Sequence, residues 1–375
     1  MKILFTGGGT GGHFYPIIAV AQEIKRLVEA EKLVPPELYF MAPDPYNRRL
    51  LFEEGIKFIP MATGKWRRYF SLLNFFDFFK TSIAVANAIV KIYFLYPDVV
   101  FSKGGFGAFP ALVAARFLRI PVVMHESDSK PGRVSAWSGK FAIAIACSYP
   151  EAAKFFKESK TAVTGNPIRR ELLMPIKGGA YEFLKLDPAV PTLFIVGGSL
   201  GAVTLNDTLL DILPELLNRY QIIHQVGKNN HHDVKNRSHF ILKDHPHKER
   251  YHLFDYLNES AMRMVAAVAE LGISRAGSAI FEFANWELPT ILIPIPESIS
   301  HDQHTNAFTY ARSGAAVVIE ESNLKPSVLT EEINRLMDSP PLREKMKEGA
   351  RKFKRPEAGE IIAKQILTIA LEHEK

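Results

Sequence analysis

The chain has 375 residues, more than one ordinary hydrophobic core needs, and its 47% hydrophobic and 23% charged residues are typical of a folded globular protein. The single cysteine, Cys147, excludes a disulfide framework and a cysteine metal cage, and its apolar neighbours indicate a buried structural thiol. A net charge of +6 favours anionic partners without choosing between lipid, nucleotide and nucleic acid. The N-terminus lacks the pattern of a signal peptide and no apolar run is long enough to span a membrane, so we expect a cytoplasmic setting.

Strand-like and helix-like segments alternate along the first part of the chain. The predicted strands are Lys2–Phe5, Leu38–Met41, Phe58–Met61, Asp98–Phe101, Val122–His125 and Ala142–Cys147. Helices are predicted between them, as at Ile17–Leu33 and Phe109–Leu118. Alternation of this kind predicts a parallel sheet wound by right-handed crossovers.

A glycine-rich turn, Gly7–Gly12, follows the first predicted strand. Such a turn presents bare backbone N–H groups and the positive end of a helix to an anion. Its spacing departs from the dinucleotide fingerprint, and no acidic residue closes the second strand to hold a ribose, which disfavours a nicotinamide enzyme. An anion cradle and a tight turn without a ligand both remain open here.

His13 comes directly after this turn, at the start of the next helix. The positive helix end would keep the imidazole neutral, as a general base requires. The alternative is a histidine that only forms a local hydrogen bond.

Two further polar segments follow later strands. The turn Lys103–Gly107 suits either packing or a second phosphate contact, and His125–Asp128 places polar groups where open α/β sheets bind ligands. His125 and Asp128 alone do not make a metal site, because a third ligand is missing.

The segment Lys65–Lys80 joins basic and aromatic residues to a wide apolar arc. This composition suits an anionic lipid surface, and the alternative is a core helix of the first domain.

The second part of the chain repeats the alternation after a predicted boundary near Thr164–Pro167. A second glycine turn, Gly197–Gly201, follows the first of its strands, and the stretch His231–His252 is basic and is interpreted as an irregular, solvated surface. The predicted strands are Leu193–Val196, Gln221–Val226, His239–Leu242, Leu271–Ser274, Thr290–Ile293 and Ala316–Ile319.

Seven segments, taken together and in this order, resemble the MurG family of bacterial glycosyltransferases. They are Gly7–Pro16, Ser102–Pro110, His125–Gly132, Gly165–Arg169, Gly197–Ala202, Ile273–Glu282 and Gln303–Ala307. Each is weak alone, but seven in order along nearly the whole chain are specific.

The resemblance implies an α/β protein of the GT-B fold, with two doubly wound Rossmann-like domains and a cleft between them. The expected acceptor and membrane-side domain is 1–164 with a returning C-terminal helix at about 352–375, and the expected donor domain is 165–351. The implied reaction is inverting transfer of N-acetylglucosamine from UDP-N-acetylglucosamine to lipid I, forming lipid II in peptidoglycan synthesis. No metal or cofactor is implied, because helix dipoles and side chains stabilise the departing UDP.

Carried over by position, the family's site residues fall on both domains. His13 and Asp128 are the catalytic candidates, and Gly11, Gly12, Gly104 and Gly105 would cradle the acceptor diphosphate. The implied donor contacts are Gly9, Thr10, Gly11, Asp128, Arg169, Ser199, Leu257, Ser278, Ala279, Ile280, Glu282 and Gln303. The interval from Gly277 to Glu282 is one residue shorter than the usual pattern, which puts the ribose role of Glu282 in question.

Two other enzyme classes share this fold. One is a sister transferase acting on another lipid or a natural product, and the other is a nucleotide-sugar epimerase, for which Glu126 and Asp128 are the available carboxylates. A non-catalytic UDP-sugar binding protein is disfavoured, because His13 accompanies the donor motifs. The implied setting is the cytoplasmic face of the cell membrane, with peripheral attachment through Lys65–Lys80 and no nucleic acid partner.

Overall fold

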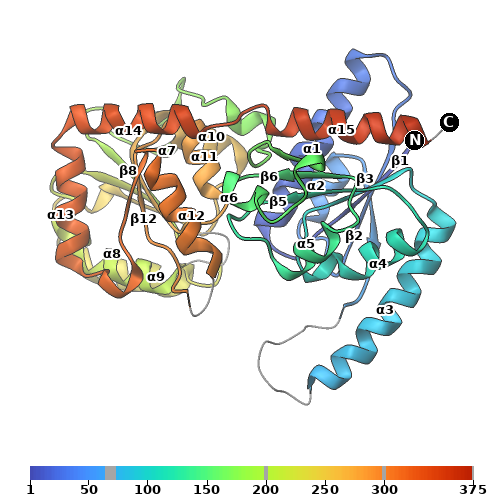
Figure 1. The fold of residues 1–375 in the computed structure, drawn as a ribbon. Coiled ribbons are helices and arrows are strands. Elements are labelled where there is room, and N and C mark those ends of the chain that lie inside the picture. The colour runs from blue at the N-terminus through green and yellow to red at the C-terminus, as the bar shows by residue number, and fades with distance from the viewer. Residues whose placement is uncertain (64–72, 198–201, 298–300, 374–375) are drawn as a thin grey trace. The chain divides into compact units, whose positions relative to one another are not determined.

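The computed structural model describes residues 1–63, 73–197, 202–297 and 301–373. The chain forms two compact units, one made of Met1–Arg170 with Arg355–Lys375 and the other of Glu171–Lys354. Each unit is a parallel sheet with helices on both faces (Figure 1), so the predicted doubly wound architecture is confirmed.

The first unit has a seven-stranded sheet in the order β3-β2-β1-β4-β5-β6-β7. Its strands are β1 (Lys2–Thr6), β2 (Glu37–Ala42), β3 (Ile56–Pro60), β4 (Val99–Ser102), β5 (Val122–Glu126), β6 (Ala144–Cys147) and β7 (Thr161–Val163). Its helices are α1 (Gly11–Ala30), α2 (Arg48–Glu53), α3 (Leu73–Leu95), α4 (Phe109–Phe117), α5 (Arg133–Ser138), α6 (Pro150–Ala153) and α15 (Ala358–His373). Helix α1 begins six residues before the predicted Ile17, so His13 lies inside its first turn.

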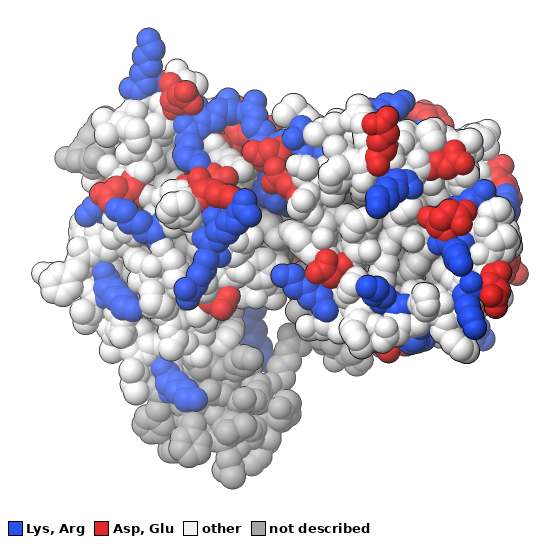
Figure 2. Space-filling model, turned by 180° about the vertical axis from the view of Figure 1, so that it is seen from behind, with Lys and Arg blue, Asp and Glu red and all other residues white. Residues whose placement is uncertain are grey.

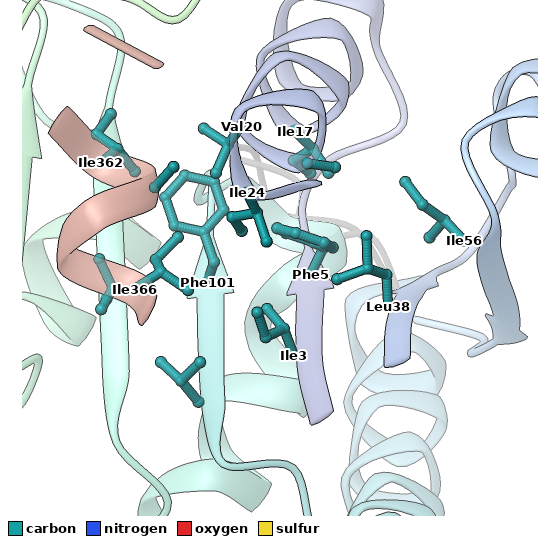
Figure 3. Packing of buried hydrophobic residues seen from close by; sticks show 14 of the residues in the cluster. Ile3, Phe5, Ile17, Val20, Ile24, Leu38, Ile56, Phe101, Ile362 and Ile366 are labelled. Carbon is teal, nitrogen blue, oxygen red and sulfur yellow. The ribbon is translucent and has the colours of Figure 1, made fainter. Parts of the chain in front are cut away.

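Side chains alternate between the two faces of this sheet, as the two-residue period of a strand requires. Ile3 and Phe5 of β1 point into the core under α1 and α15, whereas Leu4 points into the core under α3 and α4. Helix α15 returns from the end of the chain to lie beside α1. Figure 3 shows Ile362 and Ile366 of α15 packed against Phe101, next to α1.

The second unit has a six-stranded sheet in the order β10-β9-β8-β11-β12-β13. Its strands are β8 (Thr192–Val196), β9 (Gln221–Gln225), β10 (Tyr251–Phe254), β11 (Ala269–Ser274), β12 (Thr290–Leu292) and β13 (Ala316–Val318). Its helices are α7 (Ala180–Leu184), α8 (Val203–Leu216), α9 (His231–Ile241), α10 (Glu259–Val268), α11 (Ala279–Asn285), α12 (His301–Arg312), α13 (Pro326–Met337) and α14 (Pro340–Phe353). Local signals set several helix starts: Asn258 accepts the Ala261 N–H at 2.9 Å before α10, and α13 and α14 begin with proline.

One predicted strand of this unit is wrong. His239–Leu242 lies at the end of α9 and just beyond it, and the edge strand is Tyr251–Phe254. The four residues at 239–242 have a strand-like composition, but they complete a helix whose Val234 and Leu242 pack into the core. The irregular surface expected over His231–His252 is therefore helical in its first half.

The surface charge is mixed. Figure 2 shows Lys and Arg interspersed with Asp and Glu over the face that it draws, with no continuous field of one sign among its coloured residues. None of the helices in the described ranges combines the length and apolar character needed to cross a bilayer. Cys147 is buried as expected, and burial raises the pKa of its thiol to about 12.

Candidate functional site

The two glycine turns of the first unit meet at the switch point of its sheet. Strands β1 and β4 are parallel neighbours, so the turns that follow them leave the same edge. A Cβ on Gly105 would lie 3.1 Å from the backbone N and Cα of Gly8, and Gly105 has a φ of 74°. Only glycine allows both this approach and this conformation. We call the turn Gly7–Gly12 together with Gly104 and Gly105 the glycine cradle.

Part of the cradle is open to solvent. Gly9 is exposed and a Cβ there would have no neighbour within 4 Å. Gly11 is buried, and a Cβ there would lie 2.7 Å from the Tyr46 hydroxyl. Gly12 is half-buried at the start of α1. The cradle therefore offers accessible backbone on a rigid base, as an anion site at a helix N-terminus requires.

His13 is half-buried beside the cradle. Its Nδ1 lies 2.8 Å from Thr10 Oγ1, and its Nε2 lies 3.2 Å from the point that a Cβ of Gly105 would occupy. The Thr10 side chain does not cap α1, so its hydroxyl is left to orient the imidazole. Burial, followed by the positive charge of Lys103, lowers the pKa of His13 to about 4. The imidazole is therefore neutral at physiological pH.

Lys103 is the buried cation beneath the cradle, with only 2% of its surface exposed. Its Nζ lies 2.6 Å from His125 Nδ1 and 3.4 Å from Asn166 Oδ1. Burial lowers the pKa of Lys103 to about 8, against the opposing effect of Glu126 and Asp128. Because these two carboxylates lie nearby, the Lys103 side chain remains largely protonated at neutral pH.

Both nitrogens of His125 have partners within the first unit. The Nε2 lies 3.0 Å from the Gly165 carbonyl and 3.3 Å from Ser148 Oγ, so it carries the proton and leaves Nδ1 to accept from Lys103. Burial and Lys103 hold the pKa of His125 well below its usual range. Since neither nitrogen is free, His125 does not form a metal site with Asp128.

Glu126 is a buried carboxylate at the end of β5, with 5% of its surface exposed. It accepts the Asp128 N–H at 3.0 Å and the Gly132 N–H at 3.3 Å. Burial and the charge of Asp128 raise the pKa of Glu126 to about 7. Asp128 itself is half-buried. Lys103 directly follows β4 and Glu126 ends β5, so both lie at the ligand-binding edge of the sheet, although neither is among the site residues that the family resemblance implies.

Arg169 also belongs to the first unit. It is 8% exposed, and its guanidinium lies 4.3 Å from the ring centroid of Tyr15 on α1. This cation–π contact holds the side chain at the N-terminal half of α1.

In the second unit, the chain after β11 forms the start of α11. Strands β8 and β11 are parallel neighbours at the switch point of this sheet, but Ser199, in the turn after β8, lies outside the described residues. Ser278 precedes α11, and its side chain makes no capping hydrogen bond. Gln303 of α12 lies alongside, with its Nε2 3.9 Å from the Cβ position of Gly277 and its Oε1 accepting the Ile295 N–H at 3.3 Å.

The other predicted donor residues of the second unit differ in burial: Ala279 and Glu282 are half-buried, whereas Ile280 and Leu257 are buried. Glu282 lies one turn beyond Ser278 on the same side of α11. The Ile280 side chain is in the core, and its N–H donates to Gly277 at 3.2 Å. Leu257 is buried, and its N–H donates to Gln225 Oε1 at 2.8 Å. It follows β10, three strand positions from β11 and thus roughly 14 Å along the sheet.

Comparisons with known proteins agree along most of the chain. The glycosyltransferase family 28 N-terminal domain matches residues 3–147, and the glycosyltransferase family 28 C-terminal domain matches residues 192–361. The chain is 37% identical over 338 residues to the UDP-N-acetylglucosamine--N-acetylmuramyl-(pentapeptide) pyrophosphoryl-undecaprenol N-acetylglucosamine transferase of Clostridium novyi, covering 89% of this chain and 90% of that one. It is also 36% identical over 367 residues to a Bacillus cereus protein whose name is the same except for a final "2". That match covers 97% of this chain and 99% of the Bacillus cereus protein.

A solved structure gives the same result for the fold. The crystal structure of Acinetobacter baumannii MurG matches with a TM-score of 0.73 and 26% identity, over 98% of this chain and 99% of that one. The two parallel sheets and this likeness identify the fold as GT-B.

Proposed function

The chain belongs to the MurG family of glycosyltransferases, and from that premise we propose that it transfers N-acetylglucosamine from UDP-N-acetylglucosamine to the 4-hydroxyl of the muramoyl sugar of lipid I, forming lipid II. One observation carries the assignment of roles: the two glycine turns of the first unit meet with His13 Nε2 facing them. A sister transferase or an epimerase is not favoured, since the relatives at 36–37% identity carry this transferase's name over most of the chain.

The acceptor half of the site is the glycine cradle. Its backbone N–H groups and the positive end of α1 suit the diphosphate of lipid I. Lys103 adds a buried positive charge beneath the same turns. Two anionic phosphates there would offset the charge of Lys103, which is the second cause of the low pKa of His13. Acceptor binding would therefore raise the basicity of the imidazole when a base is needed.

His13 is the proposed general base. In the tautomer that this role requires, Nδ1–H donates a hydrogen bond to Thr10 Oγ1, and the lone pair of Nε2 lies on the side of the cradle. Nε2 accepts the proton of the acceptor hydroxyl as the oxygen bonds to the anomeric carbon of the donor sugar. The bond from that carbon to the UDP phosphate oxygen breaks, UDP leaves with the electron pair, and the configuration inverts. Asp128 is the second candidate base, or a hydrogen-bond acceptor for a sugar hydroxyl.

The donor half is assigned to the second unit. The start of α11, at Ser278 and Ala279, suits the UDP diphosphate. The hydroxyl of Ser278 makes no capping hydrogen bond and is therefore available to a phosphate oxygen. Glu282 would hold the ribose hydroxyls and Gln303 would read the sugar. From the first unit, the proposed donor contacts are Gly9, Thr10, Gly11, Asp128 and Arg169. No nucleic acid takes part in the proposed reaction.

A peripheral position at the cytoplasmic face of the membrane follows from the lipid-linked acceptor. Most of the predicted membrane segment, Lys65–Lys80, lies outside the described residues or has no described side chain. The described part of α3 supports the proposal, because Ile83, Val90 and Phe94 are 69%, 55% and 79% exposed at spacings of seven and four residues. They form one apolar stripe on the helix, as a lipid-facing surface requires.

The transfer reaction is tested with radiolabelled donor and a synthetic lipid I analogue. UDP release should depend on the acceptor, and the label should appear in a disaccharide-linked lipid. Release of UDP without acceptor, or formation of a sugar epimer from the donor alone, would rule out the assignment.

The membrane contact is tested by sedimentation with anionic vesicles. Replacing Ile83, Val90 and Phe94 with serine should release the folded protein from the vesicles. The matched control replaces three other exposed apolar residues of the first unit, Val34, Phe52 and Phe155, and should leave binding intact. Equal binding by both variants would contradict the role of α3.

A further inference from the structure

The second unit contains a hollow of about 810 Å³ beside its edge strand. One wall is α9 and the other is formed by the loop after α9 and by β10. Its rim has five basic residues, which are His231, Lys235, His239, Lys243 and Lys248. The first four recur at intervals of four residues, so they follow one side of α9 and of the chain just beyond it. We call this hollow the basic groove.

The basic residues of the groove have no acidic partners. In the described part of the chain, none of the five forms an ion pair, and no acidic residue lines the hollow. The acids closest in sequence, Asp233, Asp244 and Glu249, do not line the hollow. Asp233 pairs with Arg237, and Glu249 Oε1 lies 3.9 Å from His247 Nδ1. Lys235, Lys243 and Lys248 thus have no carboxylate within ion-pair distance among the described residues, and carboxylates of a ligand in the hollow could pair with them.

The floor of the groove is apolar. Leu242 is buried, and Tyr251 and Leu253 are half-buried against the core of the unit. A row of cations beside apolar side chains matches a ligand that carries both carboxylates and apolar groups.

The loop that forms one wall is held in place. His245 Nε2 donates to the Pro214 carbonyl at 2.9 Å, and Arg250 Nη1 donates to the Leu217 carbonyl at 3.0 Å. Both bonds tie the loop to the C-terminal end of α8. The hollow is therefore a built feature of the unit.

We propose that the basic groove binds an acidic, amphipathic peptide segment of a partner protein. Carboxylates of the segment would pair with Lys235, Lys243 and Lys248, and its apolar side chains would pack on Tyr251 and Leu253. Lys235 and Lys243 are eight residues apart, or about 12 Å along a helix, so the cations suit an extended ligand and do not converge on a single phosphate.

Two other polyanions fit the groove less well. A bilayer surface is broad and contacts protruding elements, whereas these cations line a hollow. A nucleic acid backbone presents sugars and phosphates, and these polar groups would not pack against the apolar floor of the groove. None of the residues assigned to transfer lines the groove, so the proposal is independent of the catalytic assignment.

The test uses fluorescence anisotropy with the full-length protein and three labelled 16-residue peptides. The first has Glu and Leu at helical amphipathic positions, the second replaces Leu with Ser, and the third replaces Glu with Gln. The first peptide should bind at least tenfold more tightly than either of the others. Equal binding of the first two would remove the role of the apolar floor and overturn the proposal.

Variants locate the site. Lys235→Glu with Lys243→Glu should weaken binding of the first peptide at least tenfold. The matched control, Lys177→Glu with Lys345→Glu, makes the same change of net charge at two other exposed lysines and should weaken it less than twofold. Equal loss in both pairs would mean that only net charge matters, and the proposal would fail.

Competition separates the possible ligand classes. A single-stranded DNA 16-mer and anionic phosphatidylglycerol vesicles should not displace the first peptide at concentrations at which the unlabelled peptide does. The assignment to a peptide would be overturned if the DNA or the vesicles displaced the peptide and bound more tightly than it does. In that case their binding should also be lost in the Lys235→Glu, Lys243→Glu variant.

Discussion

Lys103 Nζ lies 2.6 Å from His125 Nδ1, and His125 Nε2 lies 3.0 Å from the Gly165 carbonyl. This buried chain of hydrogen bonds joins the end of β4, the end of β5 and the segment after β7. It fixes a positive charge beneath the glycine cradle at a point where burial alone would favour a neutral amine. The electrostatics of the glycine cradle therefore depend on Lys103 and His125, which are not among its glycines.

His13→Ala should lower kcat roughly 100- to 10,000-fold, because general base catalysis is lost. The dissociation constant of UDP-N-acetylglucosamine should change less than twofold, as measured by calorimetry. His232→Ala replaces an exposed histidine and serves as the control. A parallel loss of donor affinity would make His13 a binding residue.

Thr10→Val should lower kcat by about tenfold while Thr10→Ser keeps it, because only the hydroxyl can fix the tautomer through Nδ1 of His13. Steady-state kinetics with a lipid I analogue measure both variants. Full activity in Thr10→Val would show that the imidazole does not need this hydrogen bond.

Lys103→Met should raise the pKa of His13 from about 4 toward its ordinary value of 6.5. Removing the nearby positive charge favours the imidazolium, and the rise remains partial because burial, the larger cause, is unchanged. Titration of ¹³C-labelled histidine by NMR measures the shift, with the His13 signal identified by its loss in His13→Gln. Lys103→Arg retains the charge and should leave the pKa low. An unchanged pKa in Lys103→Met would contradict the electrostatic role of Lys103.

Glu126→Gln should stabilise the protein above pH 7 and have less effect near pH 4.5. The folded pKa of about 7 exceeds the unfolded value of 4.5, so the folded state binds more protons between these pH values. The wild type therefore loses stability as the pH rises through this window, whereas the variant has no carboxylate to ionise there. The gain is at most about 3 kcal/mol.

Urea denaturation at pH 4.5, 6 and 8 measures this difference in unfolding free energy. Glu158→Gln, at an exposed position, should show no such trend and is the control. A gain in unfolding free energy that does not grow with pH would mean that ionisation of Glu126 does not destabilise the folded protein.

Gly105→Ala should destabilise the first unit and abolish most of the transfer activity. The new Cβ would lie 3.1 Å from the backbone of Gly8, at a φ of 74° that an alanine adopts at a cost of about 1 kcal/mol or more. Gly132→Ala, where a Cβ meets nothing within 4 Å, should change stability by less than about 0.5 kcal/mol. Thermal denaturation and turnover of the two variants decide the point, and equal effects would mean that the close approach of the turns is not required.

Local sequence was sufficient for much of the fold. Runs such as Leu193–Val196 followed by glycine predict a strand and a turn, because burial on both faces of a parallel sheet requires consecutive apolar residues. His239–Leu242 also has a strand-like composition, but these four residues lie at the C-terminal end of α9 and at its cap. A run of four residues is too short for its periodicity to separate a strand from a buried helix end.

The chemistry of the site depended on contacts between distant residues. The sequence alone placed glycines and His13 after the first strand, since a bare turn and a helix start are encoded by neighbouring residues. Only the tertiary structure put Lys103 against His125 and buried Glu126 next to Asp128. The charge and protonation of these side chains follow from burial and from through-space distance, which sequence spacing does not specify.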